Sequence, residues 1–116
     1  MLEGFEPLVP LNAENKRMTI TFTYLERGNS WRASFNGGAV KHGKLGRDIE
    51  VLHNPEAKEV AFRPTTSSNP SRFKATPTGG SLAISGGQVA TLIGVTPDRR
   101  KFPLELRDGA LILSYA

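Results

Sequence analysis

The sequence contains no cysteine, only two histidines and no long apolar run. Without cysteine the chain forms neither a disulfide nor a thiolate zinc site, and His42 and His53 stand apart from other metal ligands, so we expect no metal and no cofactor. No stretch approaches the roughly 20 apolar residues that span a bilayer, and the N-terminus lacks a basic segment followed by an apolar one. We therefore expect a cytoplasmic protein without membrane association.

Turn-forming residues are plentiful, with 12 glycines and 8 prolines in 116 positions. A chain of this length suits one domain with one core, and so many turns favour short strands over long helices. We predict a mainly β fold with two short helices. Residues 1–17 show no periodicity, so we expect a flexible N-terminal arm ahead of a single domain at 18–116. The arm can dock through its apolar side chains, Phe5, Leu8, Val9 and Leu11.

Alternating apolar and polar residues predict the strands of the first half. Ile20, Phe22 and Tyr24 share one face of a strand that ends before a turn at 28–30. A second strand at 31–35 leads to Asn36, whose side chain can cap a short helix. A hairpin then follows, with strands at 49–53 and 60–63 around a turn at 54–57.

The second half predicts a similar series of elements. Strands at 73–76 and 82–84 flank a turn at 77–80, and Ser85 is placed to cap a helix that ends at Gly94. The final hairpin, at 102–115, turns at Asp108-Gly109, a dipeptide suited to a two-residue turn with positive φ.

An internal repeat organises these elements. The segment RASFNGGAV at 32–40 matches SLAISGGQV at 81–89 with an offset of 49 residues, and Ile49 lies opposite Leu104 further on. We infer a duplicated strand–helix–hairpin unit, at about 18–64 and 71–116, in which each copy buries the apolar face of the other in a small barrel. If the match is a coincidence in a glycine-rich chain, a β-sandwich or an SH3-like barrel is expected instead.

Charge is distributed unevenly along the chain. Residues 27–47 carry five basic residues and no acidic one, residues 48–59 have a net charge of −3, and residues 60–101 have a net charge of +5. Because a solvating surface normally mixes the two signs, this segregation predicts a two-sided molecule with an anion-binding surface. The five residues of the first basic stretch are Arg27, Arg32, Lys41, Lys44 and Arg47.

The first unit resembles the AbrB-type swapped-hairpin family. The run RASFN at 32–36 stands where that family has G-R-x-x-[IL]-P, and LGRDIEV at 45–51 stands where it has L-G-[IL]-x-x-G-D-x-[IVL]. The segment VAFRP at 60–64 is similar to the closing strand. The likeness covers about residues 19–64 and, more faintly, 71–115, and two units in one chain resemble the tandem MraZ arrangement.

This resemblance implies an AbrB-like barrel and double-stranded DNA as the partner. In the family, basic residues of the first hairpin loop and the short helix contact DNA, which implies roles for Arg27, Arg32 and Lys41, with Lys44 and Arg47 nearby. We therefore predict a DNA-binding transcriptional regulator or architectural factor that reaches phosphates and bases through the first repeat. The second repeat adds a possible secondary basic loop, formed by Arg99, Arg100 and Lys101.

Other functions remain open at this stage. The same barrel can serve as a protein-interaction or phage-type accessory module. A DNA-binding protein of this kind can also form a homodimer that presents two basic copies, and single-stranded nucleic acid can stack on Trp31, Phe35 and Phe73. The glycine pairs lack phosphate-loop spacing. Neither the two histidines nor Ser67 and Ser68 form a recognisable nucleophile and base set, so no enzymatic activity is expected.

Overall fold

The structure is a computed structural model that describes residue 4 and residues 17–116. Most of the N-terminal arm expected at 1–17, including its docking residues Phe5, Leu8, Val9 and Leu11, lies outside the described residues.

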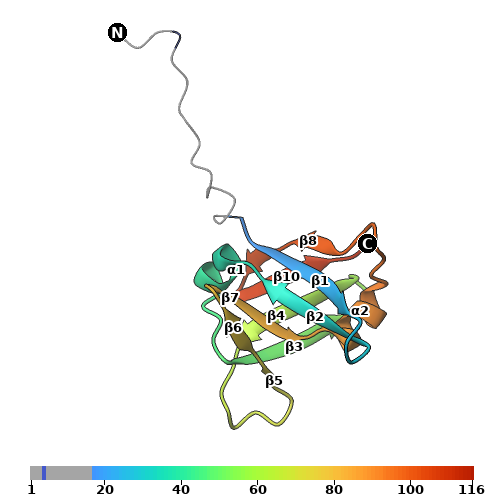
Figure 1. Cartoon of the computed structure of the whole chain (residues 1–116). Coiled ribbons are helices and arrows are strands. Elements are labelled where there is room, and N and C mark those ends of the chain that lie inside the picture. Colours follow the sequence, from blue (N-terminus) through green and yellow to red (C-terminus); the bar gives the residue numbers. More distant parts are fainter. Residues whose placement is uncertain (1–3, 5–16) are drawn as a thin grey trace.

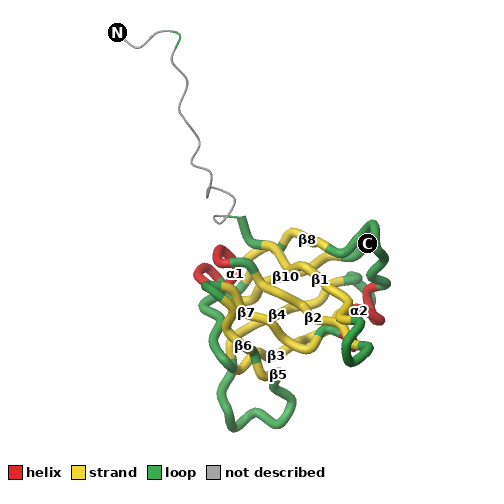
Figure 2. Tube along the Cα trace, in the orientation of Figure 1, coloured by secondary structure: helices red, strands yellow, loops and turns green. Residues whose placement is uncertain are grey.

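The described chain contains ten strands and two short helices, so the predicted mainly β fold is confirmed (Figures 1 and 2). The asparagine cap, the Asn54 turn and the Asp108-Gly109 hairpin all form as expected, the last with φ of 53° and 78°. The elements in chain order are β1 (Thr19–Leu25), β2 (Ser30–Phe35), α1 (Gly37–His42), β3 (Asp48–Asn54), β4 (Glu59–Pro64), β5 (Phe73–Lys74), β6 (Thr76–Thr78), β7 (Ser81–Ser85), α2 (Gly87–Ile93), β8 (Lys101–Pro103), β9 (Glu105–Arg107) and β10 (Ala110–Ser114).

The strands form two antiparallel sheets of five. Sheet A has the order β6-β7-β2-β1-β8 and sheet B the order β5-β3-β4-β10-β9. The small barrel expected from the sequence is therefore not closed. Each sheet ends in strands of only two or three residues, and no edge strand of one sheet pairs with an edge strand of the other, although the chain passes between the sheets at Ala75 and at Leu104.

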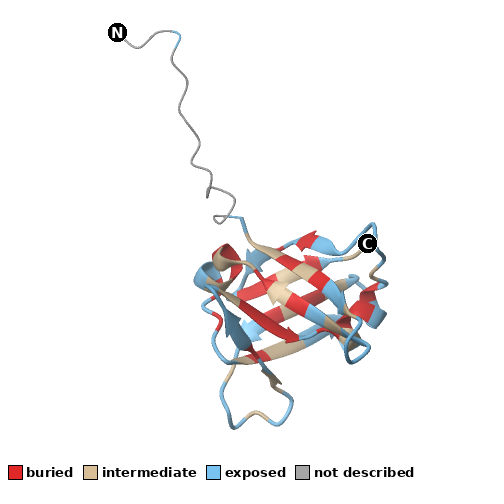
Figure 3. Ribbon diagram, viewed as in Figure 1, coloured by how far each residue is buried: buried red, intermediate tan, exposed pale blue. Residues whose placement is uncertain are grey.

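One core lies between the two sheets. Buried and more exposed residues alternate along β1 and β2 of sheet A (Figure 3). The buried residues Ile20, Phe22 and Phe35 belong to one core cluster with buried residues of sheet B such as Phe62. The rings of Phe35 and Phe62 pack edge to face, with centroids 5.0 Å apart. This aromatic contact joins the two sheets within a core that consists mainly of aliphatic side chains.

The strand registers relate the two halves by an approximate two-fold axis. Ser34 lies opposite Ala83 where β2 pairs with β7, and Phe62 lies opposite Leu111 where β4 pairs with β10. Both pairs are 49 residues apart, the offset of the sequence repeat. An antiparallel pair in which equivalent positions face each other is the register that a two-fold axis generates, so an axis passes through both sheets.

The two halves also exchange edge strands. Strand β8 of the second half pairs with β1 of the first, and β3 of the first half pairs with β5 of the second. Neither half contains all the strands of one sheet, so each half needs the other to bury its apolar face.

The two helices begin differently. Asn36 Oδ1 accepts hydrogen bonds from the backbone N–H groups of Ala39, at 2.8 Å, and Thr19, at 3.1 Å, and its Nδ2 donates to the carbonyl of Arg17. The predicted Ser85 cap is wrong, because the N-cap of α2 is Gly86, which has no side chain to offer, and Ser85 remains in β7 opposite Arg32. The asparagine therefore joins α1 to the start of β1, whereas α2 has no equivalent link.

We expect Asn36→Ala to lower the free energy of unfolding by about 1–2 kcal/mol, because it removes a helix cap and leaves two part-buried N–H groups without their acceptor. Ser85→Ala is the matched control and should change stability by less than about 0.5 kcal/mol. Urea denaturation of both variants measures the difference. Equal effects would mean that Asn36 does not hold α1 and β1 together.

Candidate nucleic-acid interface

The two helices lie at opposite ends of the strands (Figure 2). Strand β2 runs from the β1–β2 turn to α1, while the N-cap of α2, Gly86, donates its backbone N–H to the carbonyl of Trp31 at the other end of β2. Arg27 lies in the β1–β2 turn and therefore at the α2 end, whereas Lys41 lies at the α1 end. The six residues of β2 separate the two ends by roughly 20 Å.

The five basic residues of the first repeat therefore do not form one cluster. Lys41, Lys44 and Arg47 lie on α1 or between α1 and β3, Arg27 lies at the opposite end, and Arg32 lies on β2 between them. All five are exposed, and none forms an ion pair with another described residue.

Two residues of the second basic loop, Arg99 and Arg100, belong to the α2 end. Arg99 and Arg100 lie between α2 and β8, and the Arg100 carbonyl accepts a hydrogen bond from the backbone N–H of Phe22. Lys101 begins β8 directly opposite Thr21 of β1. The second repeat thus supplies basic residues to the same end of the molecule as Arg27.

The outer face of sheet A is rich in hydroxyl groups. Because Ile20 and Phe22 point into the core, the threonines that alternate with them point outward. In a neighbouring row of outward positions, Arg32 of β2 lies between Thr23 of β1 and Ser85 of β7. A first row of outward positions crosses all five strands. That first row consists of Lys101, Thr21, Ser34, Ala83 and Thr76.

No strand of sheet A contains an aspartate or glutamate. The charged residues within these strands are Arg32 and Lys101, both exposed and both cationic. This face can therefore attract an anion without opposition from a carboxylate on the same strands.

Sheet B holds the acidic residues and pairs them with arginines. Glu50 bonds to Arg63, and Glu59 forms a two-pronged pair with Arg107, whose second contact is Glu105 at 2.9 Å. Two donated hydrogen bonds hold the pKa of the Glu50 carboxyl below its usual value. The one from Asn69 has the larger effect and the one from Arg63 the smaller. The hydrogen bonds that Arg107 donates to Glu59, and to a lesser extent to Glu105, raise the pKa of its guanidinium.

The fourth acidic residue of sheet B is Asp48. Its Oδ1 lies 3.1 Å from Arg72 Nε, an ion pair by distance although the N–H is not aimed at this oxygen. The carboxylates in the strands of sheet B are thus paired with arginines, whereas Arg32 and Lys101 of sheet A and Lys74 of β5 form no ion pair with another described residue. The two-sidedness expected from the sequence corresponds to this difference between the sheets.

The aromatic residues do not form a stacking platform on sheet A. Phe35 is fully buried, so the expectation that it stacks on a base is wrong, because its position in β2 points into the core. Trp31 and Phe73 are half-buried and pack against the core, and Trp31 contacts the ring of Tyr24 with centroids 5.3 Å apart. Contacts from the outer face of sheet A would therefore come from hydroxyl and cationic groups.

The histidines and serines named above lie apart. His53 shares a 2.7 Å hydrogen bond with the Tyr115 hydroxyl, and the Ser68 hydroxyl bonds to Thr66 in the loop between β4 and β5. Among residues 17–116 there is no group of three or more histidine, aspartate or glutamate side chains suited to a metal ion. None of the helices described is long and apolar enough to cross a membrane.

The hydroxyl face and Lys74 were not singled out from the sequence. The alternation in TITFT at 19–23 carried the signal for the outward threonines, because the same period that places Ile20 and Phe22 inside places Thr21 outside. No comparable signal exists for Lys74 of β5, which lines the same groove as Arg32, because that placement depends on how β2, β7 and β6 pair.

Comparisons with known proteins add no further assignment, since the chain matches no protein-family model, no curated protein and no solved structure.

Proposed function

We propose that this protein binds DNA without catalysing a reaction and acts as a transcriptional regulator or architectural factor. The observation that carries the proposal is the contrast between the sheets. Sheet A presents cations and hydroxyl groups without a carboxylate in its strands, whereas the acidic residues of sheet B are paired with arginines. Phosphate groups are bound by arginine, lysine, serine and threonine side chains, which are the residues that this face offers.

The arrangement favours contacts to the backbone of a duplex over insertion between bases. The basic residues are spread over the outer face of sheet A and both of its ends, so several phosphates along a duplex can be reached at once. Arg27, Arg99 and Arg100 would act at the α2 end, and Lys41, Lys44 and Arg47 at the α1 end. Arg32 and Lys101 lie on the face between these ends.

The proposal is tested by fluorescence anisotropy with a labelled duplex of about 20 base pairs, titrated at low salt and then over a salt series. We expect binding that weakens steeply with salt. In a plot of the logarithm of the binding constant against the logarithm of the salt concentration, the slope should be about −0.9 for each phosphate neutralised. Replacing Arg32 and Lys101 together by alanine should weaken binding roughly tenfold and make the slope less steep by about 2, because two phosphate contacts are lost.

The matched control replaces Arg63 and Arg107 by alanine, which removes the same formal charge from sheet B. Both arginines are about half exposed and already paired with carboxylates. This variant should bind DNA like the parent protein within about threefold, because both arginines lie in sheet B, away from the proposed binding face. It should also remain folded, since surface ion pairs contribute little to stability. Affinity independent of salt, or equal losses in the two double variants, would contradict the proposal.

A second candidate is a protein-interaction module, and the outer face of sheet B is the observation that favours it. Leu52, Ala61 and Ile112 lie side by side on β3, β4 and β10, with Leu52 39% exposed, between the Glu50 and Glu59 ion pairs. An apolar row with a charged rim is typical of protein interfaces. A lack of duplex binding at low salt would favour this candidate over DNA binding.

A further inference from the structure

A groove of about 380 Å³ lies on the outer face of sheet A, where the two repeats meet. One wall comes from the β1–β2 hairpin and the other from β5, β6 and β7. Its lining includes two cations and four hydroxyl groups, and no carboxylate. These polar residues are Ser30, Arg32, Lys74, Thr76, Thr78 and Ser85.

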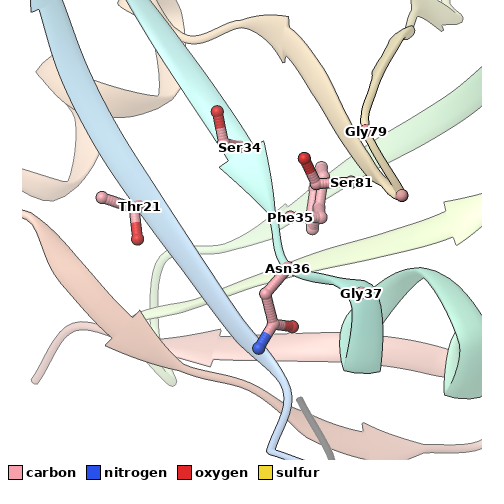
Figure 4. A pocket seen from close by; sticks show the side chains of 8 residues that line it. Thr21, Ser34, Phe35, Asn36, Gly37, Gly79 and Ser81 are labelled. Atoms are coloured by element: carbon pink, nitrogen blue, oxygen red, sulfur yellow. The ribbon is translucent and has the colours of Figure 1, made fainter. Parts of the chain in front are cut away.

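The approximate two-fold axis provides a reference for this groove inside the same molecule. A second groove, of about 430 Å³, lies on the same face toward α1 and includes Thr21, Ser34 and Ser81 (Figure 4). It has no cation. The residue that corresponds to Arg32 through the offset of 49 is Ser81, so the two related grooves differ in charge.

Both cations of the first groove are available to a ligand. Neither Arg32 nor Lys74 forms an ion pair with another described residue. Lys74 lies opposite Asp48 in the pairing of β5 with β3, but the Asp48 carboxylate contacts Arg72 instead, at 3.1 Å. Both side chains are exposed, so packing against neighbouring residues does not prevent them from turning toward a ligand.

The hydroxyl groups complete a set of donors around the cations. Ser85 lies directly opposite Arg32 in the ladder between β2 and β7, and Thr76 lies opposite Ala83, two residues before Ser85. The side chains of Ser30, Thr76 and Ser85 make no hydrogen bond to another described residue. These hydroxyl groups are therefore free to donate to a bound oxyanion.

We propose that this groove is a phosphate-binding site assembled from both repeats. The planar guanidinium of Arg32 can donate two parallel hydrogen bonds to phosphate oxygens, while Lys74 supplies a point charge from the opposite wall. The hydroxyl groups of Ser85 and Thr76 bind the remaining oxygens. The inference rests on the proposed function only for the source of the phosphate, which is either the DNA backbone or a free phosphate ester.

The test follows backbone amide signals of the ¹⁵N-labelled full chain by NMR. Three probes are added separately at low salt: inorganic phosphate, adenosine monophosphate and a duplex of about 20 base pairs. We expect shifts at Arg32, Lys74 and Ser85 with each probe, and none at Ser34 or Ser81 with the two small probes. The double variant Arg32→Ala with Lys74→Ala should lose the small-probe shifts and bind the duplex roughly tenfold more weakly.

The control is again Arg63→Ala with Arg107→Ala, which should keep all shifts in the groove. Arg32→Gln with Lys74→Gln repeats the test with longer side chains, and dispersed amide signals verify that each variant is folded. Small-probe shifts that persist in the groove variant, together with duplex binding as tight as in the control, overturn the groove and leave the proposed function intact.

The remaining outcomes separate the two proposals further. Small-probe shifts without duplex binding support the groove, overturn DNA binding and identify a free phosphate ester as the source. Small-probe shifts that are no larger in this groove than in the related one near α1 overturn the phosphate site, because charge would then make no difference. The absence of any response overturns both proposals.

Discussion

Phe62→Ala should lower the free energy of unfolding by about 3–5 kcal/mol, the usual cost of removing a buried aromatic ring. Phe62 is fully buried and contacts the ring of Phe35 from the other sheet, with an interplanar angle of 77°. It also lies opposite Leu111, beside the approximate two-fold axis. Its loss would leave a cavity between two sheets that are each fixed by their own ladders and cannot collapse to fill it.

Chemical denaturation with urea measures this effect, and Leu52→Ala on the same sheet is the control. Leu52 is 39% exposed on the outer face, so its truncation should change the free energy of unfolding by less than about 0.5 kcal/mol. Domains of this size have a total stability of about 5–15 kcal/mol, so Phe62→Ala should leave a marginally stable protein. Comparable losses in the two variants would contradict a core centred on Phe62.

Local patterns were sufficient to predict most of the strands. Alternation placed β1 and β2 correctly, because inward residues such as Ile20 and Phe35 follow the period of a half-buried strand. The largest error in a strand lies near Pro77. The expected turn at 77–80 begins later, because Pro77 lies inside the three-residue edge strand β6, where a missing N–H costs little.

The offset of 49 residues predicted more than the repeat itself, because the same offset relates Ser34 to Ala83 and Phe62 to Leu111 across the paired strands. The offset could not predict whether the sheets close into a barrel. Closure depends on the length of the edge strands and on the bends at Ala75 and Leu104, where the chain moves from one sheet to the other.

The candidate site was less predictable than the fold. Arg27 and Lys41 lie 14 positions apart in a stretch without acidic residues, but β2 carries the chain across the molecule between them. Conversely, Arg32 and Lys74 are far apart in sequence and line one groove. Charge along a sequence indicates which segments are basic, whereas strand pairing determines which basic residues share a surface.

Gly86→Ala should lower the free energy of unfolding by about 1–3 kcal/mol, the range for forcing an atom into a packed interior. A Cβ atom at Gly86 would lie 2.8 Å from the backbone nitrogen of Ala33 and 3.1 Å from its Cβ. Ala33 is in the middle of β2, between β1 and β7, and cannot move without disturbing both ladders. The dihedral angles of Gly86, φ −107° and ψ −1°, lie outside the left-handed region, so the expected loss comes from space alone.

Gly87→Ala, at the next position, is the control, and we expect it to raise the free energy of unfolding. A Cβ atom there would meet nothing within 4 Å, and alanine in place of glycine at the start of α2 should raise stability by up to about 1 kcal/mol. Thermal unfolding of the two variants measures the contrast, and similar shifts in both would contradict the close approach of α2 to β2. The glycine of the first repeat that corresponds to Gly86 is Gly37, where a Cβ atom would meet only the carbonyl oxygen of Gly80, at 3.7 Å. The crowding at Gly86 therefore belongs to one repeat only, although both repeats contain a Gly-Gly pair.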